Sequence, residues 1–487
     1  MSVLAIDQGT TSTRALLVED DGSRRILASF THSQSYPAPG RVEHDPEELL
    51  AHVRACLDAG RAAGARAWGL ANQGESCLAW DARTGRALGP VIVWQDDRTA
   101  PEIARLAADG AEALTLARAG LPLDPYFSAS KLAWCLRNLP EAPALAATGR
   151  LRLGTTDGFF RDRLLGDFAT DPTTASRTSL MALETCAWDA DLCALFGVPV
   201  ECLPAIRPTT GGLGEAGGLA LAASVVDQQA ALYGHGCREP GRAKITFGTG
   251  AFALCVTKAL APAGRGPLPT IAWAIDGEPP AYALDGGVYA AASAVEWARK
   301  AGLFATREEI SSFEGEPAIA RGLAFVPALA GLACPHWDRA ARGAFLGLEL
   351  ATSGHDMARA VLEGIAFRTA EVIASMAAIE PLADTVLVDG GLSGNPYFVR
   401  FLADTLGRAV VVSDEPELTA MGTAALAARG AGLPAAPTPG GSRIEPRLQP
   451  ADWQARFSAA RAAIAAFGMH RPEEARDTSA RSAHSTL

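Results

Sequence analysis

One short pattern recurs in both halves of this chain: an apolar run, a turn of glycine and hydroxyl residues, and a second apolar run. The turn at residues 7–14 (DQGTTSTR) lies between apolar runs, and so does the turn at residues 247–252 (FGTGAF). A third turn, residues 389–395 (DGGLSGN), follows an apolar run and precedes an expected helix over 396–406. Apolar runs bounded by such turns are typical of strands. The repeat predicts two related α/β domains that face each other.

The length of the chain agrees with this division. Its 487 residues exceed the roughly 250–300 residues at which a single hydrophobic core stops growing. We expect an N-terminal domain over 1–236 and a C-terminal domain over 237–467. The polar residues 468–487 lack hydrophobic periodicity, which predicts a disordered tail. Alanine-rich stretches at 100–117 and 455–466 predict surface helices, and Asp45 followed by Pro46 predicts the start of another helix.

Charge and cysteine content restrict the partners and the compartment. A formal net charge of −11 argues against a nucleic-acid or anionic-membrane binder, although backbone amides and local cations can still hold a phosphate. No run approaches the ~18 apolar residues of a membrane span. The nine cysteines are scattered and form no C-x-x-C pair, which favours free thiols in a reducing compartment. We therefore expect a cytoplasmic protein.

The three turns carry the groups that a nucleotide site needs. Glycines and threonines offer backbone N–H and hydroxyl groups to phosphate oxygens, and Asp7 at the head of the first turn could hold Mg²⁺. The third turn allows a planar group to approach the backbone, and the helix after it favours anions. Each turn alone is also typical of a plain hairpin or glycine loop. Neither a GxxxxGK[ST] loop nor a strand-linked GxGxxG is present, which argues against a P-loop or Rossmann site.

In this order the turns resemble the two phosphate turns and the adenosine turn of the FGGY carbohydrate kinases, which share the ATPase core of actin and hexokinase. Further segments resemble the glycerol kinases of that family, and the similarity runs from about residue 3 to 430; these segments are 39–46, 92–95, 98–100, 124–128, 175–178, 227–232, 341–348 and 362–366. The resemblance implies two ribonuclease-H-like domains around a central cleft. It also implies ATP and Mg²⁺ as cofactors and a small polyol or sugar as substrate.

The resemblance assigns a role to individual residues. It implies that Asp227 is the catalytic base, because a carboxylate within reach of an alcohol can accept its proton as the oxygen attacks the γ-phosphorus. Without the resemblance, Asp227 could equally cap a helix over 228–233. The implied substrate contacts are Gly74, Glu75, Trp94, Tyr126, Asp227, Gln228 and Phe252. The implied nucleotide contacts are Thr10, Thr11, Ser12, Arg14, Thr249, Gly250, Gly391 and Asn395, with Asp7 at the metal.

One position departs from the pattern. The glycerol kinases carry Arg-Glu where this chain has Gly74-Glu75, and the change removes a cation that donates to substrate hydroxyls. The expected activity is phosphorylation of a terminal hydroxyl, with glycerol as the first candidate. Because the change should also open space, a larger polyol or a ketopentose (erythritol, xylitol, xylulose or ribulose) is the alternative.

Two further expectations concern other classes and regulation. A non-enzymatic ATP switch of the actin or heat-shock-chaperone type would need a peptide-binding or polymer-forming region, and the residues after 430 are too few and too polar for one. Residues 211–226 contain no lysine or arginine, so we expect no inhibition by a sugar bisphosphate at this loop. A homodimer or a homotetramer is left open.

Overall fold

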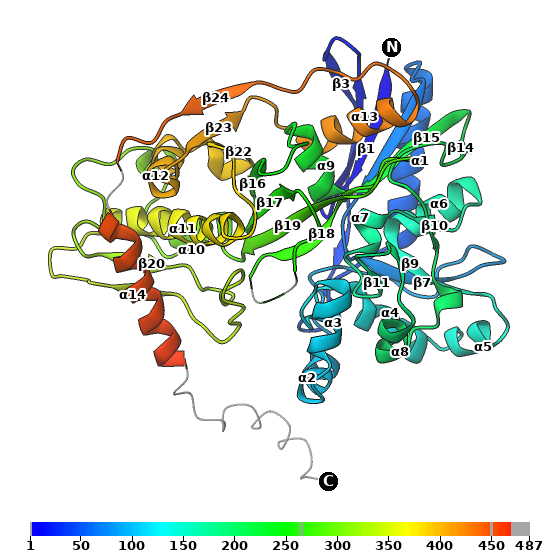
Figure 1. Ribbon diagram of the computed structural model, residues 1–487, viewed down its shortest axis with the longest axis horizontal. Helices are drawn as coiled ribbons and strands as arrows, with labels where there is room; N and C mark the ends of the chain where they lie inside the picture. Colours follow the sequence, from blue (N-terminus) through cyan, green and yellow to red (C-terminus); the bar gives the residue numbers. More distant parts are fainter. Residues whose placement is uncertain (1, 263, 265, 449–450, 469–487) are drawn as a thin grey trace, which may run out of the picture.

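The computed structural model describes residues 2–262, 264, 266–448 and 451–468 (Figure 1). The expected tail therefore lies outside the described residues, apart from Gly468 at the end of α14 (Ala451–Gly468). Two large sheets lie on opposite sides of the molecule, joined in the middle by α9 (Asp227–Gly234) and α13 (Leu418–Gly430). None of the helices in the described part of the chain is both long and apolar enough to cross a bilayer.

The N-terminal sheet has six strands in the order β14-β15-β6-β1-β2-β3. β1 runs antiparallel to β2 and parallel to β6, which in turn is parallel to β15. The strands are β1 (Val3–Gln8), β2 (Ser12–Val18), β3 (Arg24–Thr31), β6 (Ala67–Asn72), β14 (Glu215–Ala216) and β15 (Leu219–Val226). The first two strands bracket the turn that the sequence predicted at residues 7–14.

The C-terminal sheet repeats this arrangement with seven strands in the order β18-β19-β17-β16-β22-β23-β24. β16 is antiparallel to β17 and parallel to β22, which is parallel to β23. The strands are β16 (Ala243–Phe247), β17 (Ala251–Thr257), β18 (Leu268–Trp273), β19 (Ala281–Val288), β22 (Thr385–Asp389), β23 (Ala409–Ser413) and β24 (Gly441–Ile444). The prediction of two related α/β domains is thus confirmed.

A smaller α/β region is attached to the N-terminal sheet. Its five-stranded sheet is formed by β4 (Gln34–Ser35), β5 (Glu43–His44), β8 (Val91–Ile92), β7 (Cys77–Asp81) and β9 (Leu151–Thr155). Short strand pairs join β10 (Ala169–Thr170) to β13 (Ala205–Ile206) and β11 (Met181–Ala182) to β12 (Ala187–Trp188). The helices on this side of the molecule are α1 (Pro46–Ala62), α2 (Ala100–Ala108), α3 (Glu112–Ala119), α4 (Ser128–Asn138), α5 (Ala142–Ala147), α6 (Thr156–Leu165), α7 (Pro172–Ala175), α8 (Ala190–Phe196) and the 3₁₀ turn η1 (Val200–Cys202).

Two of the helix predictions can be compared with the structure. Asp45 caps α1 as expected, since its carboxylate accepts from the Glu47 N–H at 2.9 Å. The alanine-rich stretch 100–117 is helical as expected, but it is divided into α2 and α3 because Gly110, with a φ of 77°, turns the chain between them.

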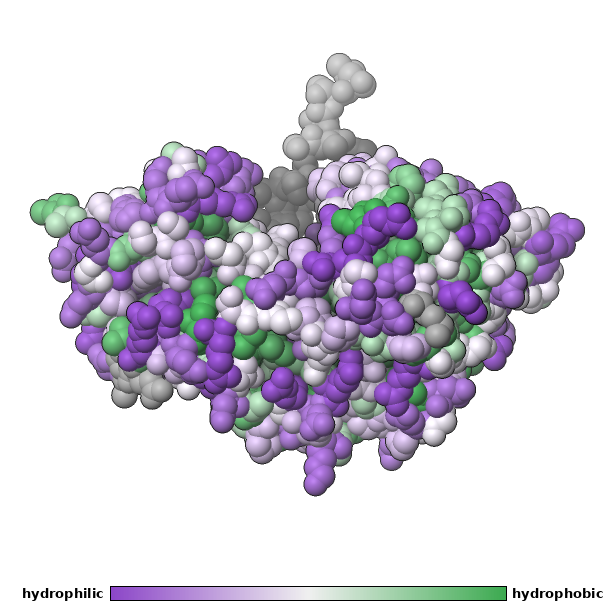
Figure 2. Space-filling model, turned by 90° about the horizontal axis from the view of Figure 1, so that it is seen from above, coloured by the Kyte–Doolittle hydropathy of each residue, from purple (hydrophilic) through white to green (hydrophobic). Residues whose placement is uncertain are grey.

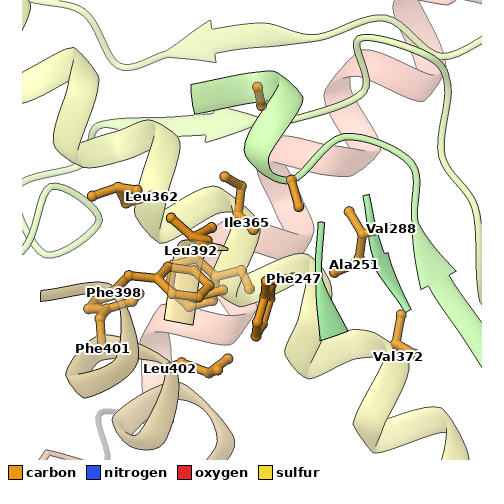
Figure 3. Packing of buried hydrophobic residues seen from close by; sticks show 14 of the residues in the cluster. Phe247, Ala251, Val288, Leu362, Ile365, Val372, Leu392, Phe398, Phe401 and Leu402 are labelled. Atoms are coloured by element: carbon orange, nitrogen blue, oxygen red, sulfur yellow. The ribbon is translucent and has the colours of Figure 1, made fainter. Parts of the chain in front are cut away.

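The C-terminal domain builds its core around the strand that carries the second turn. Phe247, at the end of β16, packs edge-on against Phe398 of α12 (Pro396–Leu406), with ring centroids 4.9 Å apart (Figure 3). Leu362 and Ile365 of α11 (Gly354–Ala377) belong to the same buried cluster. The remaining elements are α10 (Ala292–Lys300), β20 (Ala324–Val326), β21 (Ala344–Leu346) and the 3₁₀ turns η2 (Glu308–Ile310) and η3 (Gly391–Gly394).

A separate apolar cluster joins the two sheets. It combines residues of β1, β6 and β15 with residues of β17, α9 and α13. α9 and α13 approach so closely that a Cβ atom at Gly422 would lie 1.8 Å from the Ala230 carbonyl oxygen, which only glycine avoids. α13, which lies between β23 and β24 of the C-terminal sheet in sequence, is therefore packed beside the N-terminal sheet. The boundary near residue 236 stays a prediction. Hydrophilic residues predominate on the face in Figure 2, with smaller apolar areas between them.

Candidate active site

The first phosphate-type turn connects β1 to β2. The Gly9 N–H donates to the Ser12 carbonyl at 3.0 Å, which closes the turn. Thr10 and Thr11 project into a cavity of about 510 Å³ between the two sheets, whereas Ser12 is half-buried at the start of β2. Arg14, further along β2, forms an ion pair with Glu417 at 2.6 Å, just before α13.

The second turn connects β16 to β17 and faces the same cavity. Thr249 and Gly250 both line it, and Thr249 is exposed. A Cβ atom at Gly250 would lie 2.7 Å from the Val288 carbonyl oxygen, so a side chain there would displace backbone. Hydroxyl and amide donors from both halves of the chain therefore meet at one cavity, as a triphosphate between two domains requires.

A smaller cavity of about 170 Å³ adjoins the first and shares part of its lining. The structure brings all seven predicted substrate residues to this cavity: Gly74, Glu75, Trp94, Tyr126, Asp227, Gln228 and Phe252. Thr10 of the first turn also lines it. Hydroxyl-binding groups and the phosphate turn thus lie next to each other. The roles of the individual residues stay predictions.

Asp227 lies where β15 ends and α9 begins. It is the first residue of α9, and Val226 occupies the N-cap position that the sequence left open for Asp227. Burial, with the Glu75 carboxylate as the next cause, raises the pKa of Asp227 to about 7. A carboxyl with this pKa can accept a proton near neutral pH.

The turn at Gly74-Glu75 is strained. Glu75 has a φ of 59°, a left-handed conformation that few residues other than glycine adopt, and the Ser76 N–H donates back to the Gly74 carbonyl at 2.7 Å. Trp94 lies close by, and its indole N–H donates to the Thr10 hydroxyl at 2.9 Å. Backbone strain of this kind is frequent where a side chain must face a ligand.

The space beside Gly74 is restricted by one neighbour in the direction that a side chain would take. A Cβ atom there would lie 2.9 Å from the Val226 Cγ2 methyl group, which already occupies that side of the turn. The expectation that the missing arginine leaves open space at this position stays a prediction, because Gly74 also lines the small cavity. The small cavity continues toward the larger one, past Tyr126 and Asp285.

Sequence reasoning missed two charged residues of the cavity, Arg177 and Asp285. The Arg177 guanidinium donates to Glu75 at 2.6 Å and pairs with Asp285 at 2.9 Å. Although burial opposes it, the carboxylates of Asp285 and Glu75 hold the pKa of Arg177 above its usual range. Two sequence features could have indicated these residues. Arg177 lies in the segment 175–178 that resembles the family, and Asp285 interrupts an apolar strand just before two glycines.

The third turn does not line either cavity, but Gly390 packs against the Phe247 backbone, where the second turn begins. Gly391 is exposed in η3, and a side chain there would meet nothing within 4 Å. The Asn395 side-chain oxygen Oδ1 accepts from the Phe398 N–H at 2.9 Å, and its side-chain nitrogen Nδ2 donates to the Ile310 carbonyl at 2.9 Å. Asn395 therefore caps α12 and fixes η2.

Asp7 is the predicted metal residue at the end of β1. Burial raises its pKa to about 7, with the negative charges of Asp227 and Glu417 as further causes. A divalent cation would favour the ionised carboxylate, so the residue fits a magnesium ion that takes most of its ligands from phosphate and water. Within residues 2–262, 264, 266–448 and 451–468, no group of three or more His, Cys, Asp or Glu side chains could hold a metal alone.

The structure has two repeated domains, each with a phosphate-type turn, and a carboxylate beside a small polar cavity. Together these features define an ATP-dependent phosphotransferase with the core of actin and hexokinase. Residues 2–225 match the N-terminal domain of the FGGY family of carbohydrate kinases, and residues 243–431 match its C-terminal domain. The chain belongs to the FGGY family of carbohydrate kinases.

Comparison with individual proteins supports the same family. The chain is 43% identical over 447 residues to a glycerol kinase of Rhodospirillum centenum, covering 88% of this chain and 90% of the relative. It is 44% identical over 446 residues to a glycerol kinase of Thermus brockianus, with the same coverage of 88% and 90%. The solved glycerol kinase of Plasmodium falciparum with ADP superposes with a TM-score of 0.86 at 27% identity, covering 96% of this chain and 98% of that one. A xylulose kinase of Rhodospirillum rubrum superposes with a TM-score of 0.83 at 25% identity, covering 96% and 100%.

Proposed function

We propose that this enzyme transfers the γ-phosphoryl group of ATP to a terminal hydroxyl of glycerol. The observation that carries the proposal is the position of Asp227 in a cavity of about 170 Å³ that also contains Thr10 of the first phosphate-type turn. This volume is below the roughly 300 Å³ at which pockets for drug-sized ligands begin, and it suits a three-carbon polyol. The identity of 43–44% to proteins named glycerol kinase supports the same substrate.

The mechanism follows from the side chains around the cavity. Asp227 accepts the proton of the terminal hydroxyl as its oxygen attacks the γ-phosphorus in line. Glu75 accepts hydrogen bonds from substrate hydroxyls, and Arg177 holds Glu75 in place at 2.6 Å. The rings of Trp94 and Phe252 contact the carbon chain. Because the Trp94 N–H is bonded to Thr10, the wall of the substrate cavity and the phosphate turn are positioned together.

The nucleotide and its metal complete the proposal. Thr10, Thr11, Thr249 and Gly250 would donate to the phosphates, and Asp7 would hold Mg²⁺, directly or through water. Bound there, the ion would neutralise the charge on the β- and γ-phosphate oxygens. Gly391 would contact the adenosine, while Asn395 would act mainly by keeping α12 in position.

A larger substrate is the second candidate, and one observation favours it. The small cavity opens into the larger one of about 510 Å³, with Tyr126, Arg177 and Asp285 lining both. A four- or five-carbon polyol or ketopentose could place its reactive end at Asp227 and extend past these residues. The structural similarity to a xylulose kinase at 25% identity agrees with this alternative.

We also propose a cytoplasmic location and an assembly of two or four copies. The nine cysteines are free thiols, which suits a reducing compartment. Size-exclusion chromatography with light scattering measures the number of copies directly.

A panel of substrates tests the function. ADP release from ATP is measured with glycerol, erythritol, xylitol, xylulose and ribulose, and phosphorylated product is quantified by mass spectrometry. Glycerol is expected to give the highest kcat/KM. Asp227→Asn, prepared in the same way, controls for contaminating kinases. A higher kcat/KM for a ketopentose would favour the second candidate, and ADP release without any phosphorylated alcohol would overturn both.

A further inference from the structure

A buried lysine lies directly behind the substrate cavity. Lys244, on β16, is fully buried, and its ammonium donates to the Gln228 side-chain oxygen at 2.7 Å and to the Thr246 hydroxyl at 2.9 Å. No carboxylate of the described residues forms an ion pair with it. Burying an ammonium group costs free energy, so the partners of its hydrogen bonds are held closely in place.

The charges around Lys244 lie on several elements. Burial lowers its pKa, and the carboxylates of Asp389, Asp227 and Asp285 oppose that change. Asp389 is itself hydrogen-bonded to His235 at 2.9 Å. The ammonium thus lies among three acidic groups, yet its direct hydrogen bonds go to two neutral side chains. One of these, Gln228, lines the cavity.

An ammonium group can only donate hydrogen bonds, and this fixes the orientation of the Gln228 amide. The oxygen must face Lys244, so the NH₂ group is left for the occupant of the cavity. A free glutamine could present either end, because its two ends have nearly the same shape. Lys244 therefore determines that Gln228 offers the substrate a donor.

That donor matters in this cavity. Glu75, Asp227 and Asp285 line it as three carboxylates, and Gly74 has no side chain to donate. Arg177 also lines it, but its guanidinium is paired with Glu75 and Asp285. A hydroxyl that donates to a carboxylate needs a donor for its own lone pairs, which Gln228 can supply. We propose that Lys244 is a positioning residue for the substrate: it holds the Gln228 amide with its NH₂ group facing a polyol hydroxyl. This inference rests on the proposed function.

The test combines protein variants with deoxy analogues of the substrate. KM and kcat are measured for glycerol, propane-1,2-diol and propane-1,3-diol with the wild type, Lys244→Met and Lys244→Arg. Lys244→Met is expected to raise the KM for glycerol about 10-fold, while the KM for ATP changes by less than about 2-fold. For the diol that lacks the hydroxyl bound by Gln228, the increase should be about 2-fold or less. Lys244→Arg should restore most of the affinity, because a guanidinium also only donates.

Two more variants keep the inference testable if Lys244→Met does not fold. Gln228→Glu retains an acceptor for Lys244 but has no donor for the substrate, so it should reproduce the KM pattern of Lys244→Met. Thr246→Val removes the other acceptor of Lys244 and leaves Gln228 its donor, so its KM for glycerol should stay within about 2-fold of the wild type.

The outcomes separate the two proposals. If the wild type does not phosphorylate glycerol, the proposed function fails. If the wild type is active but Lys244→Met or Gln228→Glu binds glycerol normally, the inference about Lys244 is overturned. An equal increase in KM for glycerol and both diols would also overturn it, because it would reflect general damage to the cavity.

Discussion

The Val226 Cγ2 methyl group lies 2.9 Å from the point that a Cβ atom at Gly74 would occupy. Gly74 lies in the turn after β6, Val226 is the last residue of the neighbouring strand β15, and both line the substrate cavity. Because rotation about χ1 of a β-branched valine is restricted, the methyl group has few alternative positions. Gly74 and Val226 therefore act as a matched pair, and a change at one is expected to depend on the other.

The first prediction follows from this pair. Gly74→Arg alone should not improve glycerol binding, because the new side chain collides with Val226, and overpacking of this kind costs about 1–3 kcal/mol. Gly74→Arg combined with Val226→Ala should lower the KM for glycerol about 10-fold, as a charged donor reaches the substrate hydroxyls. Steady-state kinetics and thermal melts of the two single variants and the double variant measure the coupling. Equal KM values for Gly74→Arg with and without Val226→Ala would contradict the pairing.

Asp227→Asn should separate activity from stability. Loss of the base is expected to lower kcat by about 10²–10⁴-fold while ATP binding, measured by calorimetry, is retained. The fold raises the pKa of Asp227 from 3.8, the ordinary value for an aspartate, to about 7. Between pH 4 and pH 7 the unfolded chain therefore loses this proton while the folded protein keeps it, and the free energy of unfolding falls as the pH rises. Asparagine removes this loss of stability. The variant should therefore melt at a higher temperature than the wild type above pH 7, and the difference should vanish near pH 4.

Glu75 supplies a prediction about the pH dependence of the reaction. Because Asp227 must be ionised to accept a proton and its pKa is about 7, kcat/KM for the polyol should fall as the pH drops below 7. The Glu75 carboxylate contributes to this raised pKa. In Glu75→Gln the decline of kcat/KM on the acid side should therefore shift to lower pH, even though substrate binding weakens. A decline that stays near pH 7 in this variant would show that Glu75 does not act on Asp227.

Arg177 links the two halves of the chain at the small cavity, since Glu75 belongs to the N-terminal half and Asp285 to β19 of the C-terminal sheet. Arg177→Met would leave two carboxylates without their cation, which should destabilise the fold by about 3–5 kcal/mol and raise the KM for the polyol. The control is Arg359→Met. Arg359 is also buried and forms an ion pair of 3.1 Å with Glu363, and neither residue lines either of the two cavities. That variant should lose stability in urea titrations and keep the KM of the wild type.

The strand–turn–strand units were predictable because each is local in sequence. β1 and β2 flank residues 7–14, and β16 and β17 flank residues 247–252, so alternating apolar runs and glycines were sufficient to find them. Helix α1 was predictable for the same reason, since its cap and its first proline are adjacent.

The long-range contacts of the site were not predictable in this way. Arg177 and Asp285 are 108 positions apart and meet only because the region around α7 packs against the C-terminal sheet. The conflict between Gly74 and Val226 depends on the parallel pairing of β6 with β15, which places the ends of these strands together. Lys244 looks like an ordinary strand residue in sequence, and its contact with Gln228 appears only when β16 is packed against α9.

The bond between Trp94 and Thr10 gives the last prediction. Trp94→Phe keeps an aromatic wall against Tyr126, whose ring centroid lies 5.5 Å away, but removes the N–H that donates to the Thr10 hydroxyl. The KM for the polyol should change little, while kcat should fall several-fold, because the hydroxyl of the phosphate turn loses its fixed orientation. Thr10→Val removes the acceptor and any phosphate contact of that hydroxyl, so it should lower kcat more than Trp94→Phe does. Adding Trp94→Phe to Thr10→Val should then have almost no further effect, which gives a coupling of about 1 kcal/mol in a double-mutant cycle on kcat/KM for ATP. Additive effects of the two substitutions would mean that Trp94 serves only as an apolar wall for the substrate.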